Sequence, residues 1–517
     1  MARIIAGTRI FTGRRKLVCN LDVDNPFNTP KDVLNELSRI FPVHMENVSD
    51  IHYLDRYHRG EHHNILHRTK DIRPEVNNKV VINYAGSATR DIVAYFLGKS
   101  IQYVPKDAVN RESTKVLNDA LASENKNRVD MEIANWLSIC GIGYRGVYTD
   151  KDKRNGYGFN MISHSPLNTA VVHSANPTKG AAYAFTYYAV PSDTASPATI
   201  NVETKYVFTV WTKAKRYEVT IDGGIESISG ESSGISIDFN SKSVRVKTTE
   251  YSFGGYLPII EYVNNQWRMG DWESSIPLMD AIDLSASDAL NEIEQYVSSL
   301  MVVLGAEMTQ ETMDKVAELK LINITDIPEG RDVTVDYLTN SLDSQSTQVL
   351  RDYLESSLRV VVGIPDRKTR SGGGSDTGDA VFMRDGWQDI DLVASYKEQF
   401  FIDGDRDSLG AVLYILNLDK ELPRNISVSD VNIKFNRTKT ANLMTKAQSF
   451  QILVAAGIDP IDALDMVDIT TDVLDVIQRS KEYKAEQMKL ATTLMQNNES
   501  NNGGILKTDN DSTNLNQ

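Results

Sequence analysis

The feature that most constrains this chain is an acidic run, residues 269–314, that contains no lysine or arginine. The run holds ten carboxylates, which are Asp271, Glu273, Asp280, Asp283, Asp288, Glu292, Glu294, Glu307, Glu311 and Asp314. Apolar residues recur within it every three or four positions, at Met279, Ile282, Ala286, Leu290, Ile293, Val297 and Leu300. This spacing is typical of an amphipathic helix. The run therefore predicts a long helix with an acidic face, which favours a surface for neighbours or a passage over a substrate pocket.

Two more helical segments follow the acidic run and enclose a flexible loop. The first has apolar residues at Val349, Tyr353, Leu354, Leu358 and Val361, and it ends at Gly363-Ile364-Pro365. The loop at 366–378 carries three cations and a run of Gly and Ser, whose backbone moves freely. A longer helical pattern then extends from about 380 to 418.

The remaining chain predicts helices on both sides of an antiparallel β unit, so the expected fold class is α+β. Helical patterns cover residues 28–75, 85–104, 113–139 and 440–490, and Thr29-Pro30 resembles a helix start. From about 143 the period changes to two, with strands expected at 146–149, 181–190, 206–211, 216–221 and 243–249. A mixed unit is expected at 301–340, and the polar tail 491–517 favours disorder.

Composition sets broad limits on what the protein does. A chain of 517 residues predicts two to four folding units. A net charge of −15 argues against wrapping DNA with a broad basic surface, although DNA could still slide past without sticking. Cys19 and Cys140 are too few for a disulfide framework and are expected to be buried thiols. No apolar stretch is long enough to cross a membrane, and the basic segment 1–16 favours either a partner-binding arm or a solvated terminus.

Histidine gives the strongest enzymatic signal. Six of the eight histidines lie between His44 and His67. In a helix, His58 and His62, and likewise His63 and His67, would be spaced to bind zinc from one face. The nearby arginines would repel a cation, and a polar helix at a subunit contact is the simpler interpretation. A metal-dependent hydrolase or nuclease that uses the His58–His67 cluster remains the alternative function.

Other candidate sites are weaker, and no catalytic residue, metal or cofactor is expected. Gly98-Lys99-Ser100 resembles the end of a phosphate-binding loop, but the earlier glycine is replaced by Val93 and a helix leads into it. Cations in the 366–378 loop could contact phosphates, although a surface loop is the simpler interpretation. A scaffold that assembles with another protein is a third possible function.

The order of several short segments resembles the portal proteins of tailed double-stranded DNA bacteriophages, of the type found in long-tailed phages of Gram-positive hosts. These segments are residues 53–62 (YLDRYHRGEH), 77–85 (NNKVVINYA), 95–103 (YFLGKSIQY), 257–265 (LPIIEYVNN), 278–283 (LMDAID), 363–366 (GIPD) and 377–380 (TGDA). Their order and spacing carry the resemblance together. The N-terminal segment 1–50 and the polar tail lie outside it.

The resemblance implies an architecture of wing, stem, clip and crown around a central channel. The implied parts are an N-terminal arm and start of the wing (1–50), the wing (51–268), a stem helix (269–300), the clip (301–340), a second stem helix (341–365), the tunnel loop (366–379), a long wing helix with the following segment (380–430), the crown (431–490) and a disordered tail (491–517).

The resemblance also implies a structural protein rather than an enzyme. It implies a ring of twelve subunits at one capsid vertex of the virion, assembled in the host cytoplasm, through which double-stranded DNA is packaged and ejected. Its implied partners are the terminase large subunit, major capsid and scaffolding proteins, and head-completion or neck proteins, with no membrane.

The resemblance implies two sets of site residues, and our own inference from the acidic run adds a third set on the stem. The tunnel loop would face DNA with Arg367, Lys368, Arg370, Ser371, Gly372, Gly373 and Gly374. The clip would contact terminase and neck proteins with Lys320, Asn323, Asp326, Glu329 and Arg331. The acidic stem face would line the channel and repel phosphate with Asp280, Asp283, Asp288, Glu292 and Glu294.

Overall fold

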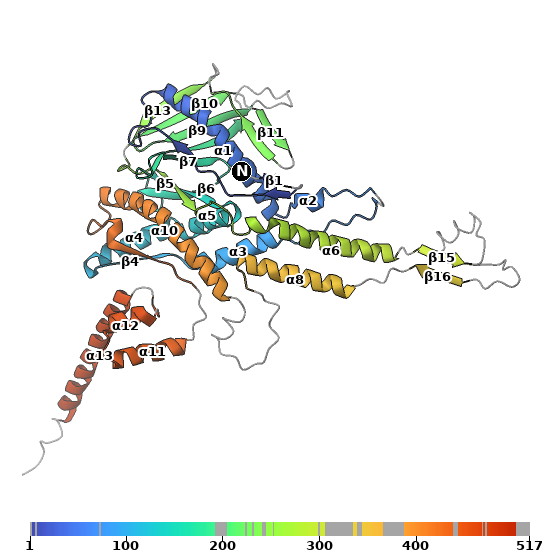
Figure 1. Ribbon diagram of the computed structural model, residues 1–517. Helices are drawn as coiled ribbons and strands as arrows, with labels where there is room; N and C mark the ends of the chain where they lie inside the picture. The colour runs from blue at the N-terminus through green and yellow to red at the C-terminus, as the bar shows by residue number, and fades with distance from the viewer. Residues whose placement is uncertain are drawn as a thin grey trace, which may run out of the picture.

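Figure 1 shows the computed structural model, in which a mixed helical and β body carries a projecting pair of long helices. The structure describes residues 3–5, 8–71, 74–191, 204–222, 225–229, 232–239, 244–251, 253–297, 300–304, 334–338, 344–365, 387–437, 443–467, 469–470 and 473–502. Helices and strands both make up much of this part, which confirms the predicted α+β class. None of the described helices is long and apolar enough to cross a membrane.

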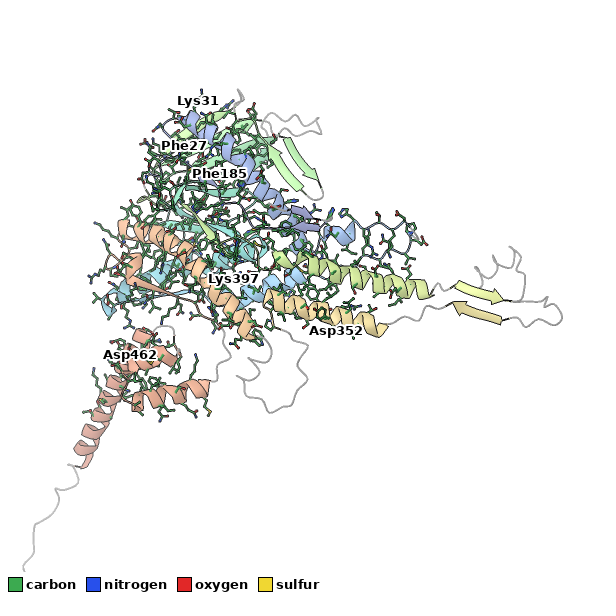
Figure 2. All side chains as sticks on the ribbon, viewed as in Figure 1. Phe27, Lys31, Phe185, Asp352, Lys397 and Asp462 are labelled. Carbon is green, nitrogen blue, oxygen red and sulfur yellow. The ribbon has the colours of Figure 1, made fainter. Side chains whose placement is uncertain are left out.

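The upper part of the body in Figure 1 is a sheet covered by the first long helix. The sheet has the order β13-β10-β9-β8-β7-β3 and is antiparallel except for the parallel pair of β3 and β7. Its strands are β3 (Val18–Cys19), β7 (Thr169–Ser174), β8 (Ala181–Pro191), β9 (Thr204–Trp211), β10 (Lys215–Asp222) and β13 (Arg245–Glu250). Helix α1 (Pro30–His58) buries Val33, Leu37 and Phe41 in the same hydrophobic cluster as the sheet. Phe27 and Phe185 belong to this cluster and are labelled in Figure 2.

A second hydrophobic cluster joins the central helices to a three-stranded sheet of order β14-β5-β6. These elements are α3 (Tyr84–Leu97), α4 (Arg111–Ser123), α5 (Lys126–Cys140), β5 (Ile142–Thr149), β6 (Phe159–His164), β14 (Ile259–Val263) and α10 (Trp387–Leu418). A short pair, β4 (Gln102–Pro105) and β17 (Val431–Lys434), connects segments that are far apart in the sequence. The hairpin of β11 (Ile225–Ser229) and β12 (Ser232–Ser236) lies beside α1, and β1 (Arg3–Ile5) pairs with β2 (Thr8–Ile10).

Several predicted boundaries were wrong in ways that single residues explain. The predicted 85–104 helix ends at Leu97, and β4 replaces its last turn. The predicted 113–139 helix is two helices, because Asn125 adopts a left-handed conformation that a helix cannot contain. The start at Thr29-Pro30 is confirmed, since the Thr29 amide donates to Asp32 Oδ2 at 2.8 Å.

The N-terminal segment is neither a free arm nor a solvated terminus from Phe11 onward, which corrects both expectations. Phe11, Leu17 and Cys19 are buried, and β3 extends the upper sheet. The Arg14 side chain is fully buried and forms an ion pair with Glu273. Cys19 and Cys140 are both buried free thiols, as predicted.

The C-terminal part is helical, as predicted, and continues further than expected. It comprises α11 (Leu443–Ala455), α12 (Pro460–Val467) and α13 (Val473–Asn502), with Gly457 supplying the left-handed turn after α11. Helix α13 therefore passes the predicted crown boundary at 490 and enters the segment expected to be disordered. The rest of that tail lies outside the described residues.

Candidate functional site

Two long helices project from the body side by side and form the candidate stem (Figure 1). They are α6 (Ile276–Val297) and α8 (Ser344–Val362), close to the predicted bounds of 269–300 and 341–365. Ile276, Met279 and Ile282 of α6 and Leu358 and Val362 of α8 are buried in the central hydrophobic cluster. Helix α8 ends at Gly363, whose φ of 74° is the left-handed conformation that terminates helices.

Two buried ion pairs fix the base of α6 to distant parts of the chain. Arg14 pairs with Glu273, and both side chains are fully buried. Lys397 of α10, labelled in Figure 2, pairs with Asp271 at 2.7 Å and is 2% exposed. Removing one partner of such a pair leaves an uncompensated buried charge. Both pairs therefore set the position at which the stem leaves the body.

A strap, defined as residues 60–71 and 74–82, lies along one face of α6. Three of its backbone amides donate to successive side chains on that helix. The Ile82 amide donates to Asp283 Oδ1 at 2.8 Å, the Val80 amide to Ser287 Oγ at 2.9 Å, and the Asn78 amide to Asn291 Oδ1 at 2.7 Å. All three acceptor residues on α6 are buried.

The spacing of the strap amides matches the spacing of the acceptor side chains on α6, which explains this ladder of three hydrogen bonds. Every second residue of an extended segment advances about 6.6 Å, and every fourth residue of an α-helix advances about 6 Å. Strap amides at spacing two thus meet helix side chains at spacing four. A polar side chain at positions 283, 287 and 291 satisfies backbone groups that an apolar helix face would leave without partners.

The polar contacts around His62 strengthen one end of this ladder. His62 Nδ1 hydrogen-bonds Asp283 Oδ2, and both side chains are fully buried. The His62 ring stacks on Tyr57 with ring centroids 3.8 Å apart. Tyr57 Oη and Asn64 Nδ2 donate to the two oxygens of Asp280 at 2.8 and 2.6 Å. Burial raises the pKa of Asp280, while these hydrogen bonds oppose that rise.

The five acids predicted to line the channel therefore occupy different environments. Asp283 is 0% exposed inside the subunit, so it cannot line a bore, and that part of the prediction is corrected. Asp288 pairs with Arg68 of the strap at 2.7 Å, and Glu294 accepts a hydrogen bond from Asn78 at 2.7 Å. Glu292 is exposed on α6.

The histidine arrangement predicted for a metal site does not form. Helix α1 ends at His58 and α2 (His63–Leu66) begins after His62, so His58 and His62 do not share a helix. The rings of His63 and His67 stack on each other instead, with ring centroids 4.0 Å apart. His62, Asp280 and Asp283 do place possible ligand atoms within 4.8 Å of one another. Each of their four carboxylate oxygens accepts a hydrogen bond from the chain itself, so the cluster fastens the strap to α6.

The structure describes the elements on either side of the predicted clip and tunnel loop, but not the site residues predicted within them. Strand β15 (Leu300–Leu304) follows α6 and pairs with β16 (Thr334–Leu338), which precedes α8. The predicted clip residues Lys320, Asn323, Asp326, Glu329 and Arg331 lie outside the described residues. The predicted tunnel loop, including Arg367, Lys368, Arg370, Ser371 and Gly372 to Gly374, also lies outside them, between α8 and α10.

The strap and the Leu300–Leu304 strand were not predicted from the sequence. One signal for the strap was present, because the polar residues Asp283, Ser287 and Asn291 repeat at a spacing of four along the helix. The strand was hidden because its apolar residues continue the helical period of α6.

Two comparisons with known proteins bear on the identity of the chain. A search of curated proteins finds no match to the chain. The sequence profile described as phage portal protein, SPP1 Gp6-like, matches residues 37–490, which is most of the chain. The chain belongs to the SPP1 Gp6-like family of phage portal proteins.

Proposed function

We propose that twelve copies of this portal protein form the ring, with α6 and α8 of each copy arranged around the channel. The observation that carries this proposal is the set of large apolar side chains exposed along the two helices. They are Leu284, Leu290 and Ile293 on α6 and Val349, Leu350, Tyr353, Val360 and Val361 on α8, with exposed fractions between 44% and 74%.

Apolar residues on two different helices favour a head-to-tail contact between copies. Side chains that are this exposed in one subunit are typical of surfaces that a partner covers. A contact in which α6 of one copy meets α8 of the next uses two different surfaces, and such contacts generate a ring when the rotation between copies closes. The family membership supports a ring of this kind.

Double-stranded DNA would pass through the centre of this ring. The net charge of −15 keeps phosphate from adhering broadly, and exposed Glu292 is the stem carboxylate best placed to repel it. Arg367, Lys368 and Arg370 of the 366–379 loop would provide local phosphate contacts. The energy for packaging would come from the terminase rather than from this chain.

The tip of the stem would bind the partners that arrive from outside the capsid. The terminase large subunit would dock on the 301–340 clip during packaging, and head-completion or neck proteins would replace it. Scaffolding and major capsid proteins would surround the body of the ring in the host cytoplasm, before it becomes the portal vertex of the virion.

The test of the ring proposal is the mass of the assembly when the exposed stem surface is made charged. Tyr353→Arg combined with Val360→Glu alters one face of α8, because seven residues span two helical turns. We expect wild-type rings in electron micrographs, with a mass near twelve times 57.8 kDa, and smaller species from the double variant. Gln348→Arg, an exposed change elsewhere on α8, is the matched control and should assemble normally. Rings of unchanged mass from the double variant would refute the proposed contact.

The role of the loop is tested separately in packaging. Replacing Arg367, Lys368 and Arg370 together with Ala should leave ring formation intact and reduce DNA packaging or retention. Normal packaging by this variant would remove the tunnel loop from the proposal.

A further inference from the structure

A groove on the body of the subunit is lined by cations although the chain as a whole is acidic. The groove has a volume of about 540 Å³ and lies between α10 and the β4–β17 pair. Its lining residues are Lys106, Ile402, Arg406, Val428, Ser429, Val431, Asn432, Ile433 and Lys434. Every charged residue in this lining is a cation, and Ser429 and Asn432 add hydroxyl and amide groups.

We propose that this groove binds the phosphodiester backbone of double-stranded DNA. The three cations come from separate segments, which are the residue after β4, the middle of α10 and the end of β17. A folded surface that gathers lysine and arginine in this way fits a row of phosphates, since lysine provides point charges and arginine a planar fork. The volume is too small for a duplex, so only one strand's backbone would enter.

The neighbouring acids do not cancel the charge of the groove. Asp465 of α12 pairs with Lys434 at 2.9 Å, and Asp403 lies 3.9 Å from Arg406, but both acids are 64% or more exposed. Exposed ion pairs contribute about 0–1 kcal/mol, so a polyanion can displace them. Asp430, whose carbonyl accepts a hydrogen bond from the Lys106 amide, caps η4 (Val428–Asp430) at Ser427 with its carboxylate and keeps its negative charge, so it offsets Lys106 in part.

The position of the groove identifies which DNA it would meet. In Figure 1, β4 and the adjoining part of α10 lie at the end of the body remote from β15 and β16, on the same side as α11 to α13. The inference here rests on the proposed function. If β15 and β16 point outward to the terminase, the groove faces the capsid interior and contacts packaged DNA rather than DNA in transit.

The test is binding of a labelled random-sequence duplex to the assembled ring, measured by fluorescence anisotropy over a range of salt. The test variant is Lys106→Ala, Arg406→Ala and Lys434→Ala together. The matched control removes two lysines and one arginine at exposed positions on α1 and β13, with Lys31→Ala, Arg245→Ala and Lys247→Ala. Both sets are made in a chain whose Arg367, Lys368 and Arg370 are already Ala, so that loop contacts do not mask the result.

Three phosphate contacts would make the affinity fall about 40-fold between 50 and 200 mM salt, because each neutralised phosphate contributes a slope of about −0.9. We expect the groove variant to lose most of that slope and the control to keep it. Equal slopes in the two variants would overturn the proposal. Poly-glutamate binding that matches duplex binding and depends on the same three residues would assign the groove to an acidic protein instead.

Light scattering on the same preparations separates this inference from the proposed function. Rings whose DNA binding is insensitive to the groove variant would reject the groove and leave the portal ring untouched. A wild-type protein that forms no rings would count against the proposed assembly itself.

Discussion

Replacing Asp283 with Leu should detach the strap from the stem helix. Asp283 is fully buried and accepts hydrogen bonds from His62 Nδ1 and the Ile82 amide. Leucine has a similar size but no acceptor, so both donors would lose their partner in a site closed to water. An unsatisfied buried donor costs about 1–3 kcal/mol, and moving the His62 proton to Nε2 brings no relief, because that atom is also buried without a hydrogen-bond partner among the described residues. We therefore expect the strap to lose about 3 kcal/mol of stability.

Native-state hydrogen exchange measures this loss directly. A loss of about 3 kcal/mol corresponds to roughly two orders of magnitude faster exchange, because about 1.4 kcal/mol is a factor of ten. The faster exchange should be confined to the strap and should include the Val80 and Ile82 amides. Glu292→Leu removes an exposed carboxylate from the same helix and should leave exchange unchanged. Unchanged protection of the strap in Asp283→Leu would refute the view that the amide ladder holds it.

Three further predictions concern the body and the clip. His44 is buried and its pKa is lowered to about 3 by burial, so the folded state resists a proton that the unfolded chain takes up below about pH 6.5. Stability should therefore fall by up to about 1.4 kcal/mol per pH unit below 6.5 through His44 alone. His44→Phe should make the melting temperature fall less steeply between pH 6.5 and 4.5, with the remaining slope coming from groups such as His164, whose pKa is lowered to about 4 by burial. Parallel curves for the two proteins would contradict this. Gly141→Ala should lower the free energy of unfolding by more than about 1 kcal/mol, because φ is 81° and a Cβ would lie 2.3 Å from the carbonyl carbon of Arg268. Gly156 also has a positive φ but open space around it, so Gly156→Ala is the milder control in the same thermal unfolding experiment. Val335→Pro removes a backbone donor from β16 opposite Val303 and should abolish terminase binding, so native binding would argue against the clip assignment.

Local patterns predicted the long elements of this fold well. The apolar periods of α6, α8 and α10 and the alternation of β8, β9 and β10 are strong signals because they extend over many residues, even though the outer apolar residues of α6 and α8 are exposed in the subunit. The breaks between elements were harder to predict, since a single left-handed residue such as Asn125 divides a continuous helical pattern. The β4–β17 pair could not be predicted, because its two short strands are far apart in the sequence and neither carries a pattern that specifies the other.

The acidic run shows why a local charge pattern did not identify the channel face. Its cation-free sequence suggested one continuous repelling surface, but the counterions come from elsewhere in the chain. Arg14 neutralises Glu273, Lys397 neutralises Asp271, and Arg68 pairs with Asp288.

In the proposed ring, the repelling charge of the stem would therefore come from fewer side chains than the sequence suggests. Glu292 is exposed, and Glu294 contacts only the neutral Asn78 side chain among the bonds described, so both remain available to act on DNA. A ring multiplies each of these charges by the number of its subunits, whereas the paired acids contribute little at a distance. Electrostatic repulsion in the channel is thus expected to depend on the outer half of α6, and the acids near its base serve to fix the helix to the body.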